Sequence, residues 1–314
     1  MRGVTFWLNM ASARLLYWRL IRSVKPTICR LSHPLSPMKI PKRKPSAAPV
    51  RLKADRLLLY AVSAFAFLLL ATPVFVLLLQ GLASQAWRDL PDSAVISSAV
   101  LLSFASTAVV VCLAALFGTP LAFVLSRYAF RGKTVVSLFI ELPIVMPPAV
   151  AGLALLLTFG RRGLVGSLLA EAGILIPFSI AAVILAQFFI SAPFYIRSAQ
   201  VGFASIAAEI EDAARVDGAH GWLMFWYITL PIAWRALASG MILSWARALG
   251  EFGATILFAG NLQGKTQTMP LLVYSVFERD INAAIWTGLI LIALALAALF
   301  VSQRFASAQD RLTR

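Results

Sequence analysis

The sequence predicts an all-α protein that crosses a membrane about six times, and two observations support this: composition and the spacing of charge. Apolar residues make up 60% of the 314 residues and charged residues only 13%, a balance far from that of a soluble domain. Long stretches carry no charge, and several reach the roughly 20 residues that a helix needs to span a bilayer. Most of the chain is therefore expected to lie in lipid.

Six stretches are candidates for the spans. Four contain no charged residue: Leu57–Trp87, Ala94–Ser126, Ala172–Ile196 and Ile281–Gln303. Two are interrupted by charge: Thr134–Phe159 by Glu141, and Pro231–Gly260 by Arg235, Arg247 and Glu251. Because proline cannot donate to the helical hydrogen-bond ladder, Pro143 and the pair Pro147 and Pro148 predict that Thr134–Phe159 is bent.

Basic residues are concentrated before the first span. The formal net charge is +15, and residues 1–56 hold 13 of the 28 basic residues with Asp55 as their one acid. The rest of the chain is nearly balanced, so the excess does not indicate nucleic-acid binding. We expect a basic leader over residues 1–56, a membrane domain over residues 57–304 and a short tail over residues 305–314. Three explanations of the leader are open. Its start codon is assigned upstream of a natural start such as Met38, or the leader is a basic anchor on anionic lipid, or it is an organelle transit peptide.

The distribution of Lys and Arg also predicts how the spans are oriented. Loops that carry positive charge tend to stay on the cytoplasmic side of the membrane. The two ends and the loops after the second and fourth spans together hold 21 basic residues, whereas the opposite loops hold 5. We therefore expect a multi-pass membrane protein with both termini in the cytoplasm.

The sequence contains no pattern typical of an enzyme site. The cysteines, at positions 29 and 112, and the histidines, at positions 33 and 220, are isolated, so neither a metal site nor a nucleophilic pair is predicted. The nearest approach to a phosphate-binding G-x4-GK[ST] loop is GNLQGKT, residues 260–266, in which Gly260 lies one residue too close to Gly264. We expect no catalytic residue, no metal and no cofactor bound by this chain.

A polar stretch over residues 205–231 lies between two spans. The run SIAAEIEDAARV, residues 205–216, favours a helix. Gly218 is placed to end that helix as a C-terminal cap. Trp222, Phe225 and Trp226 then share one face of a second short helix, and we expect this face to pack against the spans.

The acidic residues of this stretch indicate what it binds. Glu209, Glu211, Asp212 and Asp217 are four acids within nine positions. One interpretation is an interfacial helix lying on the bilayer, but anionic lipids would repel these acids. A protein partner with a basic or hydrophobic groove fits the stretch better.

Charged residues inside the spans allow structural and functional interpretations. Glu141 is an intramembrane carboxylate and thus a functional candidate, but it lies near the cytoplasmic end of its span, where water or a neighbouring arginine can satisfy it. Arg247 and Glu251 are four residues apart and can pair on one helix face. The alternatives for this pair are simple charge compensation and a place beside an aqueous path for an anion.

The polar stretch matches a known pattern, D-A-A-x3-G-x9-I-x-L-P. The matching residues are Asp212, Ala213, Ala214, Gly218, Ile228, Leu230 and Pro231. This pattern resembles the cytoplasmic EAA loop of ABC importer permeases. The sequence departs from the motif at two positions. Asp212 stands where the motif begins with Glu, and Ala208 stands where a proline is often found.

A second match concerns the segment after this loop. Residues 244–278 look like the corresponding segment of the molybdate/tungstate permeases, which are related to the sulfate/thiosulfate permeases. Within GEFGATILFAGN, Phe252 stands where the sulfate relatives usually carry Tyr. The resemblance covers roughly residues 57–304.

The resemblance implies an assembly and a fold. It implies the type I ABC importer permease fold, a homodimer of this subunit, two cytoplasmic ATPase subunits that bind ATP and magnesium, and a separate extracytoplasmic binding protein. In that assembly the helix at residues 205–217 would sit in a groove of the ATPase, with Ala213 and Ala214 as a small docking face. Glu209 and Glu211 belong to the same docking helix.

Residues of the fifth span are candidates for the translocation path. An oxyanion needs hydrogen-bond donors without dense positive charge, since otherwise it would bind too tightly to leave. The candidates are Ser244, Arg247, Gly250, Glu251, Gly253 and Thr255. The alternative is that the small residues serve helix packing. Alternative functions are a sulfate/thiosulfate importer, an ATPase-independent channel or secondary transporter, and a membrane scaffold.

Overall fold

The computed structural model describes residues 52–84 and 90–312, with side chains described for residues 57–84 and 90–300. Within these residues every regular element is a helix. Five described helices are long and apolar enough to cross a membrane, and a bent pair makes a sixth span if its two halves count as one. The predicted number of spans is therefore confirmed. The leader up to residue 51 lies outside the described residues.

The chain divides into two units within α2 (Leu52–Ser84), between Phe65 and Ala66, and the packing described below lies in the second unit. The bounds of the long helices after α2 are α3 (Ser93–Arg127), α7 (Ile180–Ala204), α10 (Leu230–Leu249) and α13 (Ile281–Leu312). The shorter helices are α4 (Lys133–Val145), α5 (Pro148–Phe159), α6 (Gly166–Glu171), α8 (Ala208–Val216), α9 (Gly221–Met224), the π-helix η3 (Phe225–Thr229), α11 (Gly253–Phe258) and α12 (Met269–Phe277).

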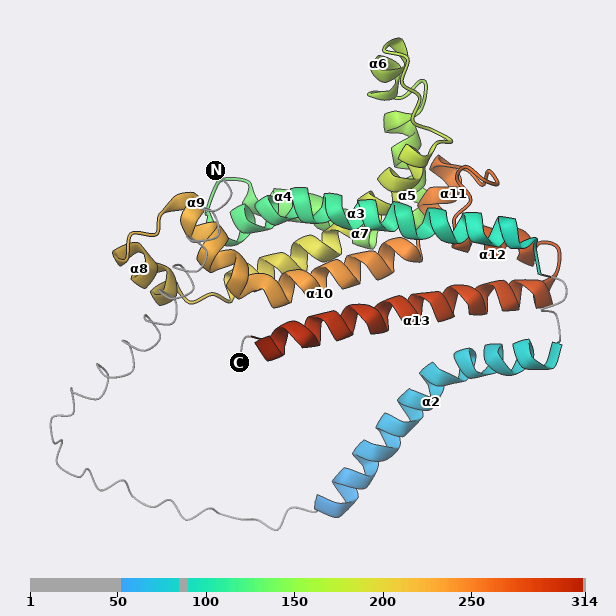
Figure 1. Cartoon of the computed structure of the whole chain (residues 1–314), viewed down its shortest axis with the longest axis horizontal. Helices are drawn as coiled ribbons and strands as arrows, with labels where there is room; N and C mark the ends of the chain where they lie inside the picture. Colours follow the sequence, from blue (N-terminus) through green and yellow to red (C-terminus); the bar gives the residue numbers. More distant parts are fainter. Residues whose placement is uncertain (1–51, 85–89, 313–314) are drawn as a thin grey trace, which may run out of the picture. The chain divides into compact units, whose positions relative to one another are not determined.

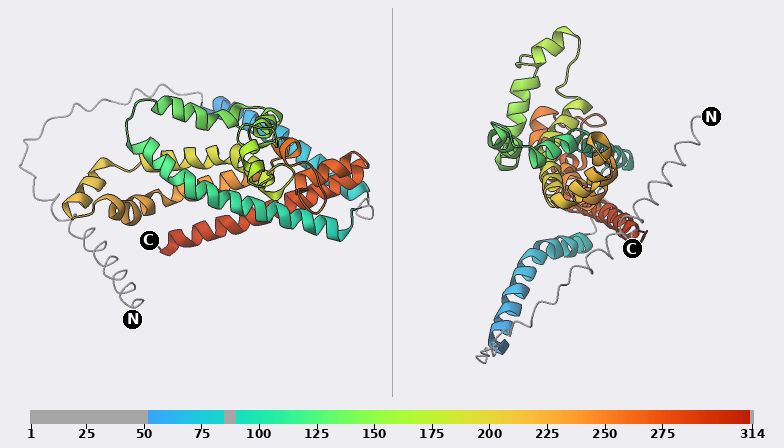
Figure 2. Two further views of the ribbon diagram at one scale, coloured as in Figure 1. Left: turned by 90° about the horizontal axis from the view of Figure 1, so that it is seen from above. Right: turned by 90° about the vertical axis from the view of Figure 1, so that its left-hand side faces the viewer.

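Helices α3, α7 and α10 pack side by side and form the centre of the second unit (Figures 1 and 2). A Cβ on Gly202 of α7 would lie 2.5 Å from Cβ of Ala236, and one on Gly240 of α10 would lie 2.7 Å from Cβ of Ser198. Glycine is therefore needed at both positions for the two helices to approach this closely. Tyr195 and Phe203 of α7 are fully buried in the same core.

The third predicted span is two helices. Helices α4 and α5 meet at an angle of 118°, so the predicted bend is confirmed and is sharp enough to break the span. Met146 and Pro147 both adopt extended backbone between the two helices. The residue before a proline is pushed out of the helical region, and Pro148 then starts α5, where its missing N–H carries no cost.

The fourth span lies further along the chain than the sequence predicts. The charge-free run begins at Ala172, but α7 begins at Ile180 and continues past Arg197 to Ala204. Phe178 has a positive φ of 59°, which is incompatible with a helix, and the hydroxyl of Ser179 accepts the N–H of Ala182 as an N-terminal cap. Local caps, and not the limits of the charge-free run, set the ends of this helix.

The fifth span also differs from the prediction of one helix from Pro231 to Gly260. The helical path begins at Gly221 in α9 and ends at Leu249, and α11 is a separate short helix. The break follows Gly250, where the carboxylate of Glu251 accepts the N–H of Ala254 at 2.9 Å and so caps α11. Figure 1 shows α8 and α9 at one end of the central helices and α11 and α12 at the other.

Candidate functional site

The acid-rich helix of the polar stretch is α8, and it is shorter than predicted. The sequence predicts a helix from Ser205, whereas α8 begins at Ala208. The reason is the side chain of Ile206, which is 4% exposed and packs into the core of α3, α7 and α10. The chain turns to place this side chain, and Ala207 is left in extended backbone without a capping side chain.

The end of α8 confirms the predicted role of Gly218. Its φ is +89°, a left-handed conformation that glycine adopts without penalty. The N–H of Ala219 donates to the carbonyl of Ala214 at 2.9 Å, and the N–H of Gly218 donates to the carbonyl of Arg215 at 3.0 Å. These two bonds form a complete Schellman motif, which fixes the direction in which the chain leaves α8.

The aromatic face after the turn divides between core and surface. Phe225 packs against Phe123 of α3 and Phe203 of α7, with ring centroids 5.1 and 6.2 Å apart. Trp222 and Trp226 are 74% and 48% exposed, so the prediction that the whole face packs against the spans is wrong.

A π-helical turn accompanies this division. The N–H of Leu230 bonds to the carbonyl of Phe225, five residues back. Pro231 follows, and a proline cannot donate to the carbonyl four residues before it. The widened turn begins at Phe225, and the rings of Trp222, Phe225 and Trp226 still contact one another, each pair with centroids 5.7 Å apart. Ile228 and Leu230 are half-buried, and Pro231 is exposed.

The acidic side chains of α8 face different surroundings. Glu209 is exposed. The carboxylate of Asp212 pairs with Arg215 at 2.6 Å on the surface of the helix. Glu211 is only 14% exposed and pairs with Arg127, the last residue of α3, at 2.6 Å. Sequence reasoning missed Arg127 as a site residue, because nothing in the spacing of residues 127 and 211 indicates that they meet.

The two alanines of the motif do not share one docking face. Ala214 is buried, and Ala213 is exposed. Adjacent residues on a helix point about 100° apart, so only one of them can face outward here. The expectation of a docking face formed by both alanines is therefore wrong for this structure, and Ala213 alone offers a small outward side chain.

An exposed surface remains on α8, α9 and η3, which we call the coupling surface. It combines large apolar side chains with acids. Its residues are Val216, Trp222, Leu223, Trp226, Tyr227, Glu209, Asp212 and Asp217. Exposed apolar side chains gathered in one place and rimmed by charge are typical of a protein interface.

Replacement of Phe225 by alanine is expected to destabilise the protein by about 3 kcal/mol, because truncation of a packed Phe leaves a cavity between α3 and α7. The lower end of the usual range applies because Phe225 is half-buried. Thermal unfolding in detergent measures the change. Trp222→Ala is the matched control, expected to change stability by about 0.5 kcal/mol or less because the side chain is exposed. Equal effects of the two substitutions would contradict the placement of Phe225.

The intramembrane charges are paired. Glu141 of α4 pairs with Arg197 of α7 at 3.2 Å, which confirms that a neighbouring arginine satisfies it. Arg247 pairs with Glu251 at 2.7 Å, and the carboxylate of Glu251 is 1% exposed. Among the side chains of residues 57–84 and 90–300, no three His, Cys, Asp or Glu residues come together as a metal site would require.

The six path candidates lie around the break between α10 and α11. Ser244 and Thr255 are fully buried, and neither hydroxyl has a hydrogen-bond partner. Gly253 packs against α5, since a Cβ there would lie 2.7 Å from Cβ of Pro148. Gly250 is exposed, and the side chain of Arg247 is 30% exposed. The structure thus gathers these residues at one place but shows them largely packed.

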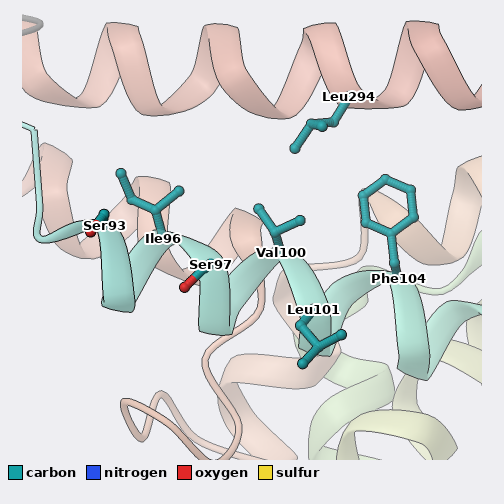
Figure 3. Close-up of a pocket in the computed structure, with 7 residues that line it drawn as sticks. All are labelled: Ser93, Ile96, Ser97, Val100, Leu101, Phe104 and Leu294. Carbon is teal, nitrogen blue, oxygen red and sulfur yellow. The ribbon is translucent and has the colours of Figure 1, made fainter.

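A hollow between α3 and α13 is apolar. It measures about 490 Å³ and is lined by α3 and by Leu294 of α13 (Figure 3). Ser93 and Ser97 are its only polar lining residues. An oxyanion requires several donors, so this hollow suits an apolar occupant and not an anion. None of the six path candidates lines it.

Comparisons with known proteins agree with this arrangement. The model of the family described as binding-protein-dependent transport system inner membrane component matches residues 114–314. The probable transport system permease protein NifC of Clostridium pasteurianum is 38% identical over 229 residues, which cover 72% of this chain and 79% of that protein. The molybdenum transport system permease protein ModB of Mycobacterium tuberculosis is 44% identical over 200 residues, covering 63% and 75%.

A sulfate relative and a solved structure complete the comparison. The sulfate transport system permease protein CysW of Synechococcus elongatus is 37% identical over 210 residues, covering 65% of this chain and 73% of that protein. A chain of a bacterial alginate ABC transporter, solved in complex with an alginate pentasaccharide-bound periplasmic protein, matches with a TM-score of 0.65 at 17% identity and covers 81% of this chain and 95% of that chain. The two proteins share a fold.

Proposed function

The chain belongs to the family of binding-protein-dependent transport system inner membrane components, and on that premise we propose that it is the membrane-spanning subunit of an ATP-driven importer of molybdate or tungstate. It is a multi-pass protein of the inner membrane. The excess of Lys and Arg in its ends and in two of its loops supports cytoplasmic termini. The chain itself carries no ATPase chemistry in this proposal.

The coupling surface is the observation that carries the proposal. It lies at one end of the central helices, on α8 and on the first residues of the fifth span, and presents tryptophans, a tyrosine and acids to the surroundings. A cytoplasmic ATPase with an apolar groove and a basic rim would complement it. Two copies of this subunit, two ATPase subunits and an extracytoplasmic binding protein form the proposed assembly. A structural neighbour solved with its periplasmic protein supports the last part of this arrangement.

The choice of anion rests on the relatives. Relatives named as molybdenum permeases are 37% to 44% identical, and relatives named as sulfate permeases are 37% to 40% identical. The residues around Phe252 resemble the molybdate group. Molybdate or tungstate is therefore the proposed substrate, and sulfate or thiosulfate is the alternative.

The proposed path passes the break between α10 and α11. Arg247 offers a partly exposed positive charge, and Glu251 neutralises most of it. A balanced charge of this kind attracts an oxyanion without holding it. Ser244, Thr255 and the backbone near Gly250 and Gly253 would donate hydrogen bonds once the helices move apart. Closure of the ATP-loaded ATPase pair would drive that movement as a rigid-body rotation.

ATP hydrolysis by the reconstituted assembly tests this function. The permease, its ATPase and its binding protein are combined, and molybdate, tungstate or sulfate is added at equal concentration. We expect molybdate and tungstate to stimulate hydrolysis and sulfate to have little effect. Stimulation by sulfate alone would overturn the proposed substrate. Absence of stimulation by every anion, in an assembly shown to contain all three components, would overturn the importer function.

A further inference from the structure

The last turn of α3 contacts both halves of the polar stretch at residues 205–231, which we call the coupling loop. Phe123 lies against Phe225 with ring centroids 5.1 Å apart, and Arg127 pairs with Glu211 at 2.6 Å. Phe123 and Arg127 are four residues apart and therefore lie on one face of α3. One turn of a membrane-spanning helix thus contacts the acid-rich helix α8 through charge and the aromatic turn η3 through packing.

The ion pair between Arg127 and Glu211 is shielded from solvent. The two side chains are 20% and 14% exposed, whereas Arg215 and Asp212, which form an ion pair within α8, are 56% and 65% exposed. Exposed pairs contribute little to stability, but a buried charge that loses its partner is costly. Nε and Nη2 of Arg127 are buried and make no aligned hydrogen bond, so Glu211 supplies their charge compensation through an ionic contact.

The ion pair joins α8 directly to α3. Its main helix contacts are with its neighbours in the chain, α9 and η3. Arg215 also approaches Glu211, at 3.8 Å, but it belongs to α8 itself and cannot tie that helix to a span. Helix α3, by contrast, packs along α7 and α10 through the membrane. The ion pair is thus a direct connection between the acid-rich helix and the spans.

We propose that Arg127 is a positioning residue for transport: it holds α8 to the end of α3, so that a displacement of α8 moves the spans. This inference rests on the proposed function, because it assigns the route by which the ATPase moves the permease. Without Arg127, α8 would still bind its partner through the coupling surface, but it would move without carrying α3. ATP hydrolysis would then continue with little dependence on the anion.

The experiment compares substitutions in the reconstituted assembly. In Arg127→Met and Glu211→Gln the anion-dependent stimulation of ATP hydrolysis is expected to fall about tenfold, a typical size for a coupling between two sites. Assembly with the ATPase is expected to persist, as measured by size-exclusion chromatography. The exchanged pair, Arg127→Glu with Glu211→Arg, is expected to restore stimulation. Arg197→Met is the matched control, because it breaks the ion pair with Glu141 at 3.2 Å without contacting α8.

A second measurement uses the isolated permease. Amide hydrogen exchange over residues 208–216 is expected to speed up in Glu211→Gln, whose side chain keeps its shape, and to remain unchanged in Arg197→Met. Normal stimulation in Arg127→Met, or no change of exchange in Glu211→Gln, would overturn the inference. Failure of the wild-type assembly to respond to any anion would overturn the proposed function, while faster exchange in Glu211→Gln would still show that the ion pair holds α8.

Discussion

Substitution of Gly218 by proline is expected to reduce anion-stimulated ATP hydrolysis at least about tenfold while the spans insert normally. Gly218 has a φ of +89°, and proline is fixed near −65°. Proline would also remove the N–H that donates to the carbonyl of Arg215. The chain could then no longer turn back after α8, and the acid-rich helix and the aromatic turn would lose their relative placement. The ATPase assay described above measures the effect.

A graded series separates backbone strain from steric clash. No atom lies within 4 Å of a Cβ built on Gly218, so a side chain there meets only the conformational penalty. That penalty is about 1 to 2 kcal/mol for alanine and smaller for asparagine, which adopts the left-handed conformation more readily. We therefore expect Gly218→Asn to be nearly silent and Gly218→Ala to be intermediate.

Gly132 provides the matched control for this series. It has the same φ of +89°, and nothing lies within 4 Å of its Cβ position either. It precedes α4 and lies outside the coupling loop. Gly132→Ala is therefore expected to cost as much stability as Gly218→Ala but to leave coupling intact. Equal loss of coupling in the two variants would show that general strain, and not the geometry of the coupling loop, is responsible.

Glu251→Ala is expected to destabilise the protein by about 3 kcal/mol, because removing one partner of a buried ion pair leaves the other without compensation. The carboxylate is 1% exposed and has two tasks: it pairs with Arg247 and accepts the N–H of Ala254. Arg247 is 30% exposed, so water can solvate its charge in part when the carboxylate is removed. The lower end of the usual range of destabilisation therefore applies. The apparent melting temperature in detergent measures this.

Two further variants test the reason for that loss. Glu251→Gln keeps an oxygen for the N–H of Ala254 and is expected to be milder than Glu251→Ala. Combining Glu251→Met with Arg247→Met removes both charges and should recover much of the stability. Glu171→Ala, which removes an exposed carboxylate, should leave the melting temperature unchanged. A melting temperature of Glu251→Ala equal to that of the wild type would contradict the proposed role of the ion pair.

The number and order of the spans could be predicted from sequence because long apolar runs have few alternatives in lipid. Their ends could not, since helix ends depend on local geometry. The start of α7 is set by Phe178 and Ser179, which lie inside a charge-free run. Arg197 continues that helix because Glu141 compensates its charge across α4 and α7, a contact that the sequence does not reveal.

The candidate site shows the same division between local and tertiary causes. The cap at Gly218 is a local feature, and the sequence predicted it correctly. The burial of Ala214 and the exposure of Trp222 depend on how the loop lies against the central helices, which no local pattern reports. In the sequence, Arg127 is only the first basic residue after a charge-free run, and its partner Glu211 is distant in sequence. Functional connections of this kind require the three-dimensional structure.

The most direct test of the importer function is accumulation of the anion in proteoliposomes. The permease and ATPase are reconstituted with ATP on the ATPase side, the binding protein is supplied on the opposite side, and labelled molybdate is offered there in competition with sulfate. We predict ATP-dependent movement of molybdate toward the ATPase side, inhibited by tungstate, resistant to excess sulfate and abolished in Gly218→Pro. Movement that proceeds without ATP, or that is unaffected by Gly218→Pro, would contradict an importer driven through the coupling surface.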